Sequence, residues 1–413
     1  MTVTLADIEA AAIVLRGAIA PTPFLRSQTL SKLSGAEVWL KFENHQFTGS
    51  FKDRGALNKL STLGPEVKQS GVIAMSAGNH AQGLAYHAGR LGIPATIVMP
   101  LGTPFVKVTG TEVLGATVVL EGETVDDAAD HAHRLAAAKG LTFVHPYDDE
   151  LVIAGQGTIG LELLAGGVAL DAVVVPVGGG GLIAGIATAL KARAPRTRIY
   201  GVQAAAYPSM WNALHGGTRP LGGQSVADGI AVKTPGTLTR PIVQALVEDV
   251  LLVDEGTIEQ AILSLLDIEK TVVEGAGAAP LAALLSEPRR FAGQRVGLIL
   301  SGGNIDPRLL ASIVMRGLAR VGRLARLRIQ LPDRPGMLGQ VAHIIGAAHA
   351  NILEVYHERA FSQFSAKSAG LVVVLETRDE AHIAHVTAKL EAGGFAVERL
   401  SPNQPGASED AAG

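Results

Sequence analysis

Short runs of apolar, mostly β-branched residues recur along residues 1–320, and Ala/Leu-rich stretches with helical spacing lie between them. Within the runs, apolar residues do not alternate with polar ones, which is typical of strands covered by helices on both faces of a parallel sheet. We therefore predict an α/β fold with doubly wound, mostly parallel sheets. The predicted strands are residues 71–75, 95–99, 116–120, 172–177, 198–203 and 296–300.

The pattern changes near Arg326, where longer strand-like runs alternate with two amphipathic stretches. Their order is strand, helix, strand, strand, helix, strand over residues 326–400. This order predicts a separate βαββαβ domain of the ferredoxin-like type. Residues 401–413 contain few apolar side chains, so we expect a flexible tail there.

Two apolar segments could be mistaken for membrane or export signals. The N-terminal segment carries acidic residues and no basic leader, which predicts an ordinary helix rather than a signal peptide. Residues 172–190 lack charge, but Pro176 and the glycines at 178–181 would break a helix exposed to lipid. The second segment is therefore predicted to be a buried strand, a loop and the start of a helix.

Composition narrows the classes of partner. The formal net charge is -3 and there is no long basic run, which argues against nucleic acid or an anionic membrane as the main partner. A small neutral or zwitterionic substrate fits better. The chain has no cysteine, which excludes disulfides and thiolate chemistry and agrees with a cytoplasmic location.

Two glycine-rich segments are candidates for nucleotide or phosphate binding. The first, "GQGTIG" at 155–160, has dinucleotide-binding spacing but lacks the strand, helix and acidic residue that such a site needs. We interpret its glycines as helix-packing residues.

The second segment, Gly178 to Gly181, follows a predicted strand and precedes a predicted helix. Together with Ala184 it also fits a nicotinamide-binding variant, but Gln203 stands where the ribose-binding carboxylate is expected. Four consecutive glycines allow backbone N–H groups to converge on one phosphate at a helix N-terminus. We therefore predict a phosphate site here.

Three further segments place polar groups after strands or beside an aromatic residue. Ser301 in "SGGN" follows a strand, at the sheet edge where open α/β sheets bind ligands. The segment "SAGNH" at 76–80 opens a helix whose N–H groups favour a carboxylate, although Ser76 or Asn79 could also act as an N-cap. In "TGSFKDRGA", Lys52 is either a nucleophile or an exposed lysine paired with Asp53.

Taken together, these segments resemble the threonine dehydratases (threonine ammonia-lyases) of pyridoxal phosphate fold type II, the tryptophan synthase β-like fold. The resemblance rests on six motifs in the family's order and covers roughly residues 5–320. It implies a catalytic domain over 1–320, with a smaller subdomain of about 48–155 inserted in a larger one. The motifs are "LKFENHQFTGSFKDRGA", "SAGNHAQG", "VGGGGLIAG", "ADGIAVKTPG", "VVEGAGA" and "SGGN".

The resemblance also implies roles for individual residues. Lys52 would form the Schiff base with pyridoxal phosphate and then act as the base at Cα of the substrate. Phe51 would lie against the ring, Asn79 would bind its 3′-oxygen and Ser301 would meet its nitrogen. The phosphate would be bound by Gly178, Gly179, Gly180, Gly181 and Leu182, and the substrate carboxylate by Ser76, Ala77, Gly78, Asn79 and His80.

The implied reaction converts L-threonine to 2-oxobutanoate and ammonia, with L-serine as a secondary substrate. Related serine racemases carry a second serine where this chain has Ala77. The absence of that hydroxyl here favours dehydration over racemisation. They also bind a divalent cation through acidic residues beginning near Gln203, and none follows it here, so no metal is expected. We interpret the acidic segment "HPYDDE" at 145–150 as a solvated loop.

The segment 326–400 resembles an ACT domain, a regulatory amino-acid-binding module that usually works in pairs. The resemblance implies control by isoleucine or valine and a homodimer or homotetramer. The effector is expected between paired domains, close to Gly336, Met337, Leu338 and Asn351.

Other functions remain open from the sequence. A serine or 3-hydroxyaspartate dehydratase, or a threonine synthase, would use the same cofactor on a different substrate. A non-catalytic amino-acid sensor would use the ACT segment alone, but it would have no need for Lys52.

Overall fold

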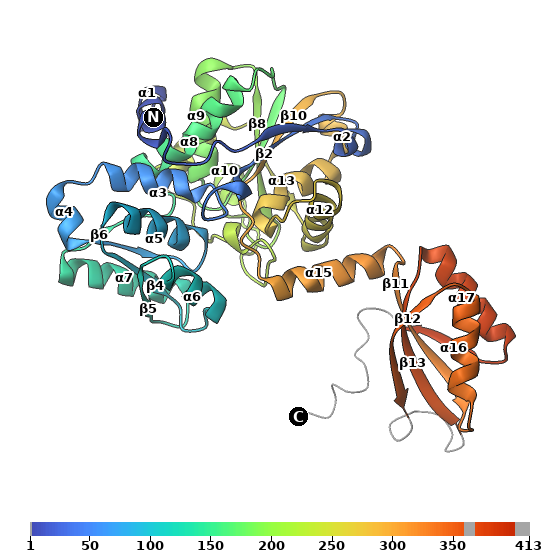
Figure 1. Cartoon of the computed structure of the whole chain (residues 1–413). Coiled ribbons are helices and arrows are strands. Elements are labelled where there is room, and N and C mark those ends of the chain that lie inside the picture. Colours follow the sequence, from blue (N-terminus) through green and yellow to red (C-terminus); the bar gives the residue numbers. More distant parts are fainter. Residues whose placement is uncertain (1, 359–367, 401–413) are drawn as a thin grey trace. The chain divides into compact units, whose positions relative to one another are not determined.

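The computed structural model of the chain describes residues 2–358 and 368–400 (Figure 1). It divides into two compact units, with the boundary between Asp306 and Pro307. The tail predicted at 401–413 lies outside the described residues.

The first unit contains a six-stranded sheet in the order β1-β2-β10-β7-β8-β9. All neighbouring pairs are parallel except β1 with β2. Three of the predicted runs form β7, β8 and β10, whereas β1, β2 and β9 were not predicted. The strands are β1 (Phe24–Ser27), β2 (Glu37–Phe42), β7 (Ala172–Pro176), β8 (Arg198–Ala204), β9 (Asp249–Val253) and β10 (Arg295–Leu300).

A second, four-stranded parallel sheet in the first unit has the order β5-β4-β3-β6. The other three predicted runs form β3, β4 and β5, and the two-residue strand β6 completes the sheet. The strands are β3 (Val72–Met75), β4 (Ala95–Met99), β5 (Thr117–Leu120) and β6 (Thr142–Phe143). The predicted doubly wound α/β class is therefore confirmed.

Helices follow the strands of both sheets and cover them, as Figure 1 shows. Two short 3₁₀ helices, Glu43–His45 and Asp228–Ile230, lie in loops. The α-helices of the first unit are α1 (Leu5–Leu15), α2 (Gln28–Ser34), α3 (Lys52–Ser61), α4 (Pro65–Ser70), α5 (Asn79–Leu91), α6 (Phe105–Glu112), α7 (Val125–Lys139), α8 (Glu150–Ala165), α9 (Gly181–Arg193), α10 (Ser209–His215), α11 (Thr239–Leu246), α12 (Glu255–Ile268), α13 (Gly275–Ser286) and α14 (Pro288–Phe291).

Glycines in α8 let it pack directly on its neighbours, as the interpretation of residues 155–160 requires. A Cβ atom at Gly155 would lie 2.7 Å from the Cα atom of Gly55 in α3, and one at Gly157 would lie 2.9 Å from the carbonyl oxygen of Gly185 in α9. Both contacts involve backbone that cannot yield. The sequence "GQGTIG" therefore serves helix packing, and the prediction is confirmed.

The apolar segment 172–190 forms β7, a loop and most of α9, as predicted. All five residues of β7 are buried, and so are Gly181 to Leu190 of α9. Within the described part of the chain, no helix is both long and apolar enough to cross a membrane.

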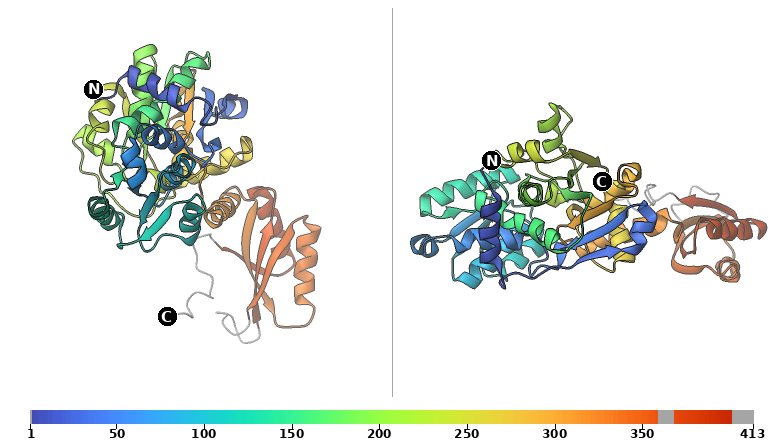
Figure 2. Two further views of the ribbon diagram at one scale, coloured as in Figure 1. Left: turned by 60° about the vertical axis from the view of Figure 1, so that its left-hand side comes forward. Right: turned by 90° about the horizontal axis from the view of Figure 1, so that it is seen from above.

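The second unit contains the predicted βαββαβ plan, preceded by helix α15 (Pro307–Arg320). Its sheet is antiparallel in the order β12-β13-β11-β14. Both of the later helices pack on one face of this sheet, as Figure 2 shows from two directions. The elements are β11 (Leu324–Pro332), α16 (Met337–Ala347), β12 (Asn351–Glu358), β13 (Ser368–Glu376), α17 (Glu380–Ala392) and β14 (Ala396–Leu400).

Candidate functional site

Lys52 is the first residue of α3, a helix that packs directly on α5 and α8. Its Nζ atom donates to the carbonyl oxygen of Pro146 at 2.5 Å and lies 5.1 Å from the centre of the Phe51 ring. Burial lowers the pKa of Lys52 to about 8, and the nearby Glu274 carboxylate opposes this shift. The amine is therefore partly unprotonated near neutral pH.

Asp53 is not the partner of Lys52. Its buried carboxylate accepts hydrogen bonds from the backbone N–H of Thr48 at 3.1 Å and from its hydroxyl at 2.6 Å, and lies 3.4 Å from Nε2 of His87. The alternative of an exposed lysine paired with Asp53 is therefore wrong. The Asp53 side chain instead shapes the turn that precedes α3.

The turn before α3 is attached to the segment after β10. The N–H of Phe51 donates to the carbonyl oxygen of Ser301 at 3.0 Å, and the N–H of Gly303 donates to that of Gly49 at 2.8 Å. Gly49 has a positive φ of 73°, and a Cβ there would lie 2.7 Å from Oδ1 of Asn304. These contacts bring Phe51, Lys52 and Ser301 together from segments about 250 residues apart in the chain.

The segment 76–80 joins β3 to α5, and α5 begins at Asn79. The Oγ atom of Ser76 accepts a hydrogen bond from the N–H of Gly78 at 3.2 Å, which shapes this loop. A Cβ at Gly83, one turn into α5, would lie 3.2 Å from the backbone of Lys52, so the helix packs directly on the start of α3. The N-terminus of α5 therefore lies close to Lys52.

His80 is buried, and its Nε2 atom lies 3.0 Å from the carbonyl oxygen of Val144. Burial lowers the pKa of His80 to about 3, with the charge of Lys52 adding to the shift. The imidazole is therefore neutral. It binds the backbone through Nε2, so its Nδ1 atom is left as an acceptor.

The glycine loop Gly178–Gly181 is enclosed by side chains that leave no room for a Cβ. A Cβ at Gly179 would lie 2.2 Å from the ring of Tyr147, and one at Gly180, where φ is 99°, would lie 2.8 Å from Oγ1 of Thr239. Thr239 also donates a hydrogen bond to the carbonyl oxygen of Gly179 at 2.6 Å. Only glycines fit this loop, and the first turn of α9 follows it with N–H groups that have no acceptor within the helix.

The segment 145–149 connects the glycine loop to Lys52 and corrects one prediction. Pro146 accepts from Lys52, and Tyr147 packs on Gly179. The Asp148 carboxylate accepts hydrogen bonds from the N–H groups of residues 237, 238 and 239, and Asp149 caps α8. The segment is therefore a partly buried bridge rather than a solvated loop, because its acids bind backbone groups instead of water.

Glu274 is a residue of the site that the sequence analysis did not select. It is buried, and its Oε1 atom accepts a hydrogen bond from Nδ2 of Asn79 at 2.6 Å. Burial raises the pKa of Glu274 to about 7; Asp228 adds to the shift, while Asn79, Lys107 and Lys52 oppose it. The available signal was a lone carboxylate directly before the glycine-rich helix of the motif "VVEGAGA".

Gln203, near which the sequence analysis looked for acidic metal ligands, makes hydrogen bonds within the protein. Its Oε1 atom accepts from the N–H of Trp211 at 3.0 Å, and its Nε2 atom donates to Ser209 at 3.3 Å. The described residues contain no group of three or more His, Cys, Asp or Glu side chains placed to hold a metal ion.

The expected effector residues lie in the second unit, at two ends of one sheet. Gly336, with a φ of 86°, caps α16 at Met337, and Leu338 is partly exposed. Asn351 starts β12 and pairs with Glu376, whereas the loop 333–336 follows Pro332 at the opposite end of β11. Within one chain the structure therefore does not bring Asn351 next to Gly336, Met337 and Leu338.

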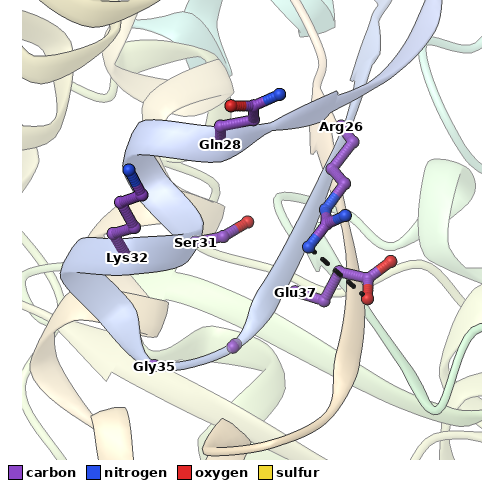
Figure 3. Close-up of a pocket in the computed structure, with 7 residues that line it drawn as sticks. Arg26, Gln28, Ser31, Lys32, Gly35 and Glu37 are labelled. Atoms are coloured by element: carbon purple, nitrogen blue, oxygen red, sulfur yellow. Dashed lines mark ion pairs between the residues drawn. The ribbon is translucent and has the colours of Figure 1, made fainter.

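Two surface hollows are lined by residues other than Lys52 and its neighbours. One, of about 410 Å³, surrounds Asn351 and includes His349, Arg378 and His382. The other, of about 550 Å³, lies over α2 and the strands beside it, where Arg26 and Glu37 form an ion pair (Figure 3). The second hollow contains none of the predicted site residues.

Comparison with known proteins identifies both parts of the chain. Residues 15–302 match the family of pyridoxal-phosphate dependent enzymes, and residues 325–392 match the ACT domain. The L-threonine ammonia-lyase of Thermotoga maritima is 44% identical over 397 residues, which cover 96% of this chain and 99% of the relative.

Solved structures agree with this assignment. The processed form of threonine deaminase isoform 2 from Solanum lycopersicum is 40% identical, with a TM-score of 0.70, over 75% of this chain and 86% of that one. A serine racemase from Dictyostelium discoideum is 35% identical, with a TM-score of 0.69, over 74% of this chain and 100% of that one. The chain is therefore a pyridoxal phosphate-dependent lyase with a C-terminal ACT domain, and it belongs to the family that includes the L-threonine ammonia-lyases.

Proposed function

We propose that this enzyme dehydrates and deaminates L-threonine to 2-oxobutanoate and ammonia. The observation that carries the proposal is the position of Lys52, which has a lowered pKa and lies among Phe51, Ser301 and the N-terminus of α5. The high identity to an L-threonine ammonia-lyase over nearly the whole chain supports the choice of substrate.

The glycine loop fits the phosphate of pyridoxal phosphate. The loop leads directly into the first turn of α9, and no residue larger than glycine can stand at positions 179 or 180. The helix N-terminus favours an anion, and the N–H groups of Gly178 to Leu182 would hold it. Phe51, Asn79 and Ser301 would hold the ring, and Lys52 would bind the cofactor covalently.

Lys52 would carry out the proton transfer at Cα of the substrate. A base acts best when its pKa lies near the working pH, and burial brings that of Lys52 down to about 8. Bound pyridoxal phosphate supplies the conjugated ring that accepts the electron pair left at Cα.

The substrate carboxylate would bind at the start of α5. Ser76 and Gly78 shape the loop there, and the N–H groups of the first helical turn have no acceptor within the helix. Because Ala77 has no hydroxyl, it cannot supply a base on the opposite face of the substrate. Dehydration is therefore favoured over racemisation.

L-Serine would be a secondary substrate. It differs from L-threonine by one methyl group. The loss of one methyl contact weakens transition-state binding by only about 1–3 kcal/mol, so the site would not strongly reject serine. Dehydration of serine or 3-hydroxyaspartate as the main reaction is the alternative within the same chemistry.

The ACT domain would regulate the enzyme by binding isoleucine or valine. Because Gly336 and Asn351 lie at opposite ends of the sheet, a single effector would contact both only where two ACT domains pair in antiparallel fashion. Such pairing requires a homodimer or homotetramer. A role in isoleucine synthesis would follow from isoleucine inhibition.

A substrate comparison tests the proposal. The purified enzyme with pyridoxal phosphate should release 2-oxobutanoate from L-threonine and pyruvate from L-serine, with the larger kcat/KM for threonine and inhibition by isoleucine. A protein that binds amino acids without turnover would support the sensor alternative and contradict the proposal.

A further inference from the structure

Asn79 lies in a chain of side-chain hydrogen bonds that joins four separate segments of the first unit. Its Nδ2 atom donates to Oε1 of Glu274 at 2.6 Å, and its Oδ1 atom accepts from Nδ2 of Asn304 at 2.7 Å. Asn304 Nδ2 also donates to the carbonyl oxygen of Thr48 at 2.7 Å. These residues come from the turn before α3, the start of α5, the turn before α13 and the segment after β10.

These hydrogen bonds fix the orientation of the Asn79 amide from both sides. The carbonyl oxygen of Thr48 can only accept, so the atom of Asn304 that meets it must be the amide nitrogen. That nitrogen requires an acceptor on Asn79, which places Oδ1 there and turns Nδ2 toward Glu274. An ionised carboxylate can only accept, so it holds Nδ2 in this orientation.

The Nδ2 atom of Asn79 carries two hydrogens, and the bond to Glu274 uses one. The other is available to a ligand. By the resemblance described above, this ligand atom is the 3′-oxygen of pyridoxal phosphate. If the amide flipped, it would present an acceptor instead and lose this bond.

The carboxylate of Glu274 has no other evident structural task. Glu274 is the N-cap residue of α13, but its side chain makes no capping hydrogen bond to that helix. Its backbone N–H donates to the carbonyl oxygen of Gly302 at 3.0 Å, which anchors the main chain independently of the side chain.

Close packing holds Glu274 and Asn79 in place. A Cβ at Gly302 would lie 2.4 Å from Oε1 of Glu274 and 3.0 Å from Nδ2 of Asn79. The charged groups that act on Glu274 are Asp228, Lys107 and Lys52. Only Asn79 donates a side-chain hydrogen bond to it among the residues that the structure describes.

We propose that Glu274 is a positioning residue that fixes the side-chain amide of Asn79 as a hydrogen-bond donor to the cofactor. The inference rests on the proposed function, because it takes pyridoxal phosphate as the ligand beside Lys52. A charge-assisted hydrogen bond of this kind is stronger than a neutral one, so Glu274 acts best when it is ionised.

A double-mutant cycle on cofactor binding tests this inference. The variants are Glu274→Gln, Asn79→Ala and the two combined, and the readouts are the Kd for pyridoxal phosphate and the visible absorbance of the loaded protein from pH 6 to 9. We expect Glu274→Gln to weaken cofactor binding by about tenfold. We also expect the double variant to bind no more weakly than Asn79→Ala, because the two residues act through one bond.

Asp228→Asn is the matched control. Asp228 is a second carboxylate whose charge acts on Glu274. It pairs with Lys107 at 2.7 Å and not with Asn79. It should leave the Kd and the absorbance profile within about twofold of the parent protein. Circular dichroism checks that each variant is folded, and Glu274→Asp replaces Glu274→Gln if the latter does not fold, with weaker binding expected because the shorter side chain cannot reach Asn79.

Independent effects of Glu274→Gln and Asn79→Ala, or an unchanged Kd in Glu274→Gln, would overturn the inference. Failure of the proposed function would look different. In that case the parent protein itself would not bind pyridoxal phosphate, or its visible absorbance would be the same in Lys52→Ala.

Discussion

The first unit buries charged groups beside its candidate site, whereas the buried side chains described in the second unit are mainly apolar. In the first unit, Arg54 of α3 and Glu43 are fully buried and joined by two hydrogen bonds of 2.7 Å, and Arg54 also binds Glu162 of α8. In the second unit, the core consists of residues such as Leu327 and Val373.

The difference reflects what each region has to hold in place. A buried ion pair adds little net stability relative to apolar packing, but it has strict geometry. Arg54 lies two residues after Lys52 on the same helix, so its contacts with Glu43 and Glu162 fix the rotation and position of α3. The ACT domain has no comparable reacting group, and its apolar core is sufficient to hold a sheet and two helices.

The largest effect of any substitution in the two units is expected at Lys52. In Lys52→Ala we expect kcat/KM for L-threonine to fall by more than about a thousandfold, because both the covalent attachment and the base are lost. Lys59→Ala on the same helix is the control, since it removes a lysine from α3 that pairs with Asp149 at 2.6 Å and has no expected role as nucleophile or base. A Lys52→Ala variant with more than about a tenth of the parent activity would contradict the account.

The next largest effect is expected at Arg54. Arg54→Met leaves the carboxylates of Glu43 and Glu162 without their main partner, so we expect a loss of about 3–5 kcal/mol in the free energy of unfolding. Trp39 and Trp211 are the two tryptophans of the chain and both lie in the first unit, so their fluorescence during chemical denaturation follows this unit alone. A loss below about 1 kcal/mol would show that the buried charges do not hold α3 in place.

The glycine loop should tolerate no side chain at position 179. Gly179→Ala would place a Cβ 2.2 Å from the Tyr147 ring, so we expect a destabilisation of about 1–3 kcal/mol and weaker binding of pyridoxal phosphate. Gly110→Ala is the matched control, because it lies within α6 and a Cβ there would meet nothing within 4 Å. Equal cofactor affinity in the two variants would count against the phosphate site.

The smallest effect is expected in the second unit. Arg399 and Glu380 form an exposed ion pair, and exposed pairs typically contribute about 0–1 kcal/mol. Arg399→Ala should therefore change hydrogen exchange in β11 and β14 only slightly. If hydrogen exchange instead showed a loss of stability as large as the ~3–5 kcal/mol expected for Arg54→Met, the contrast between the two units would be wrong.

The sequence predicted the regular parts of the fold because apolar runs and helical spacing are local signals. Six strands of the first unit and the whole βαββαβ order were found in this way. The missed strands β1 and β2 contain arginine, lysine and glutamate, and their pairing depends on residues distant in the sequence.

The site was predictable where its residues lie in local motifs, such as the glycines at 178–181. Glu274 was not, because its partner Asn79 is 195 residues away in the chain. The role of Arg54 was also hidden, since its partners Glu43 and Glu162 lie 11 and 108 residues from it. Contacts of this kind depend on tertiary packing, and neither periodicity nor composition reveals them.

The most direct test of the central claim is to reduce the cofactor-loaded enzyme with borohydride and to map the modified residue by mass spectrometry. The account predicts pyridoxyl phosphate on Lys52 in a protein that converts L-threonine to 2-oxobutanoate before reduction. Modification of another lysine such as Lys59, or of none, would contradict it.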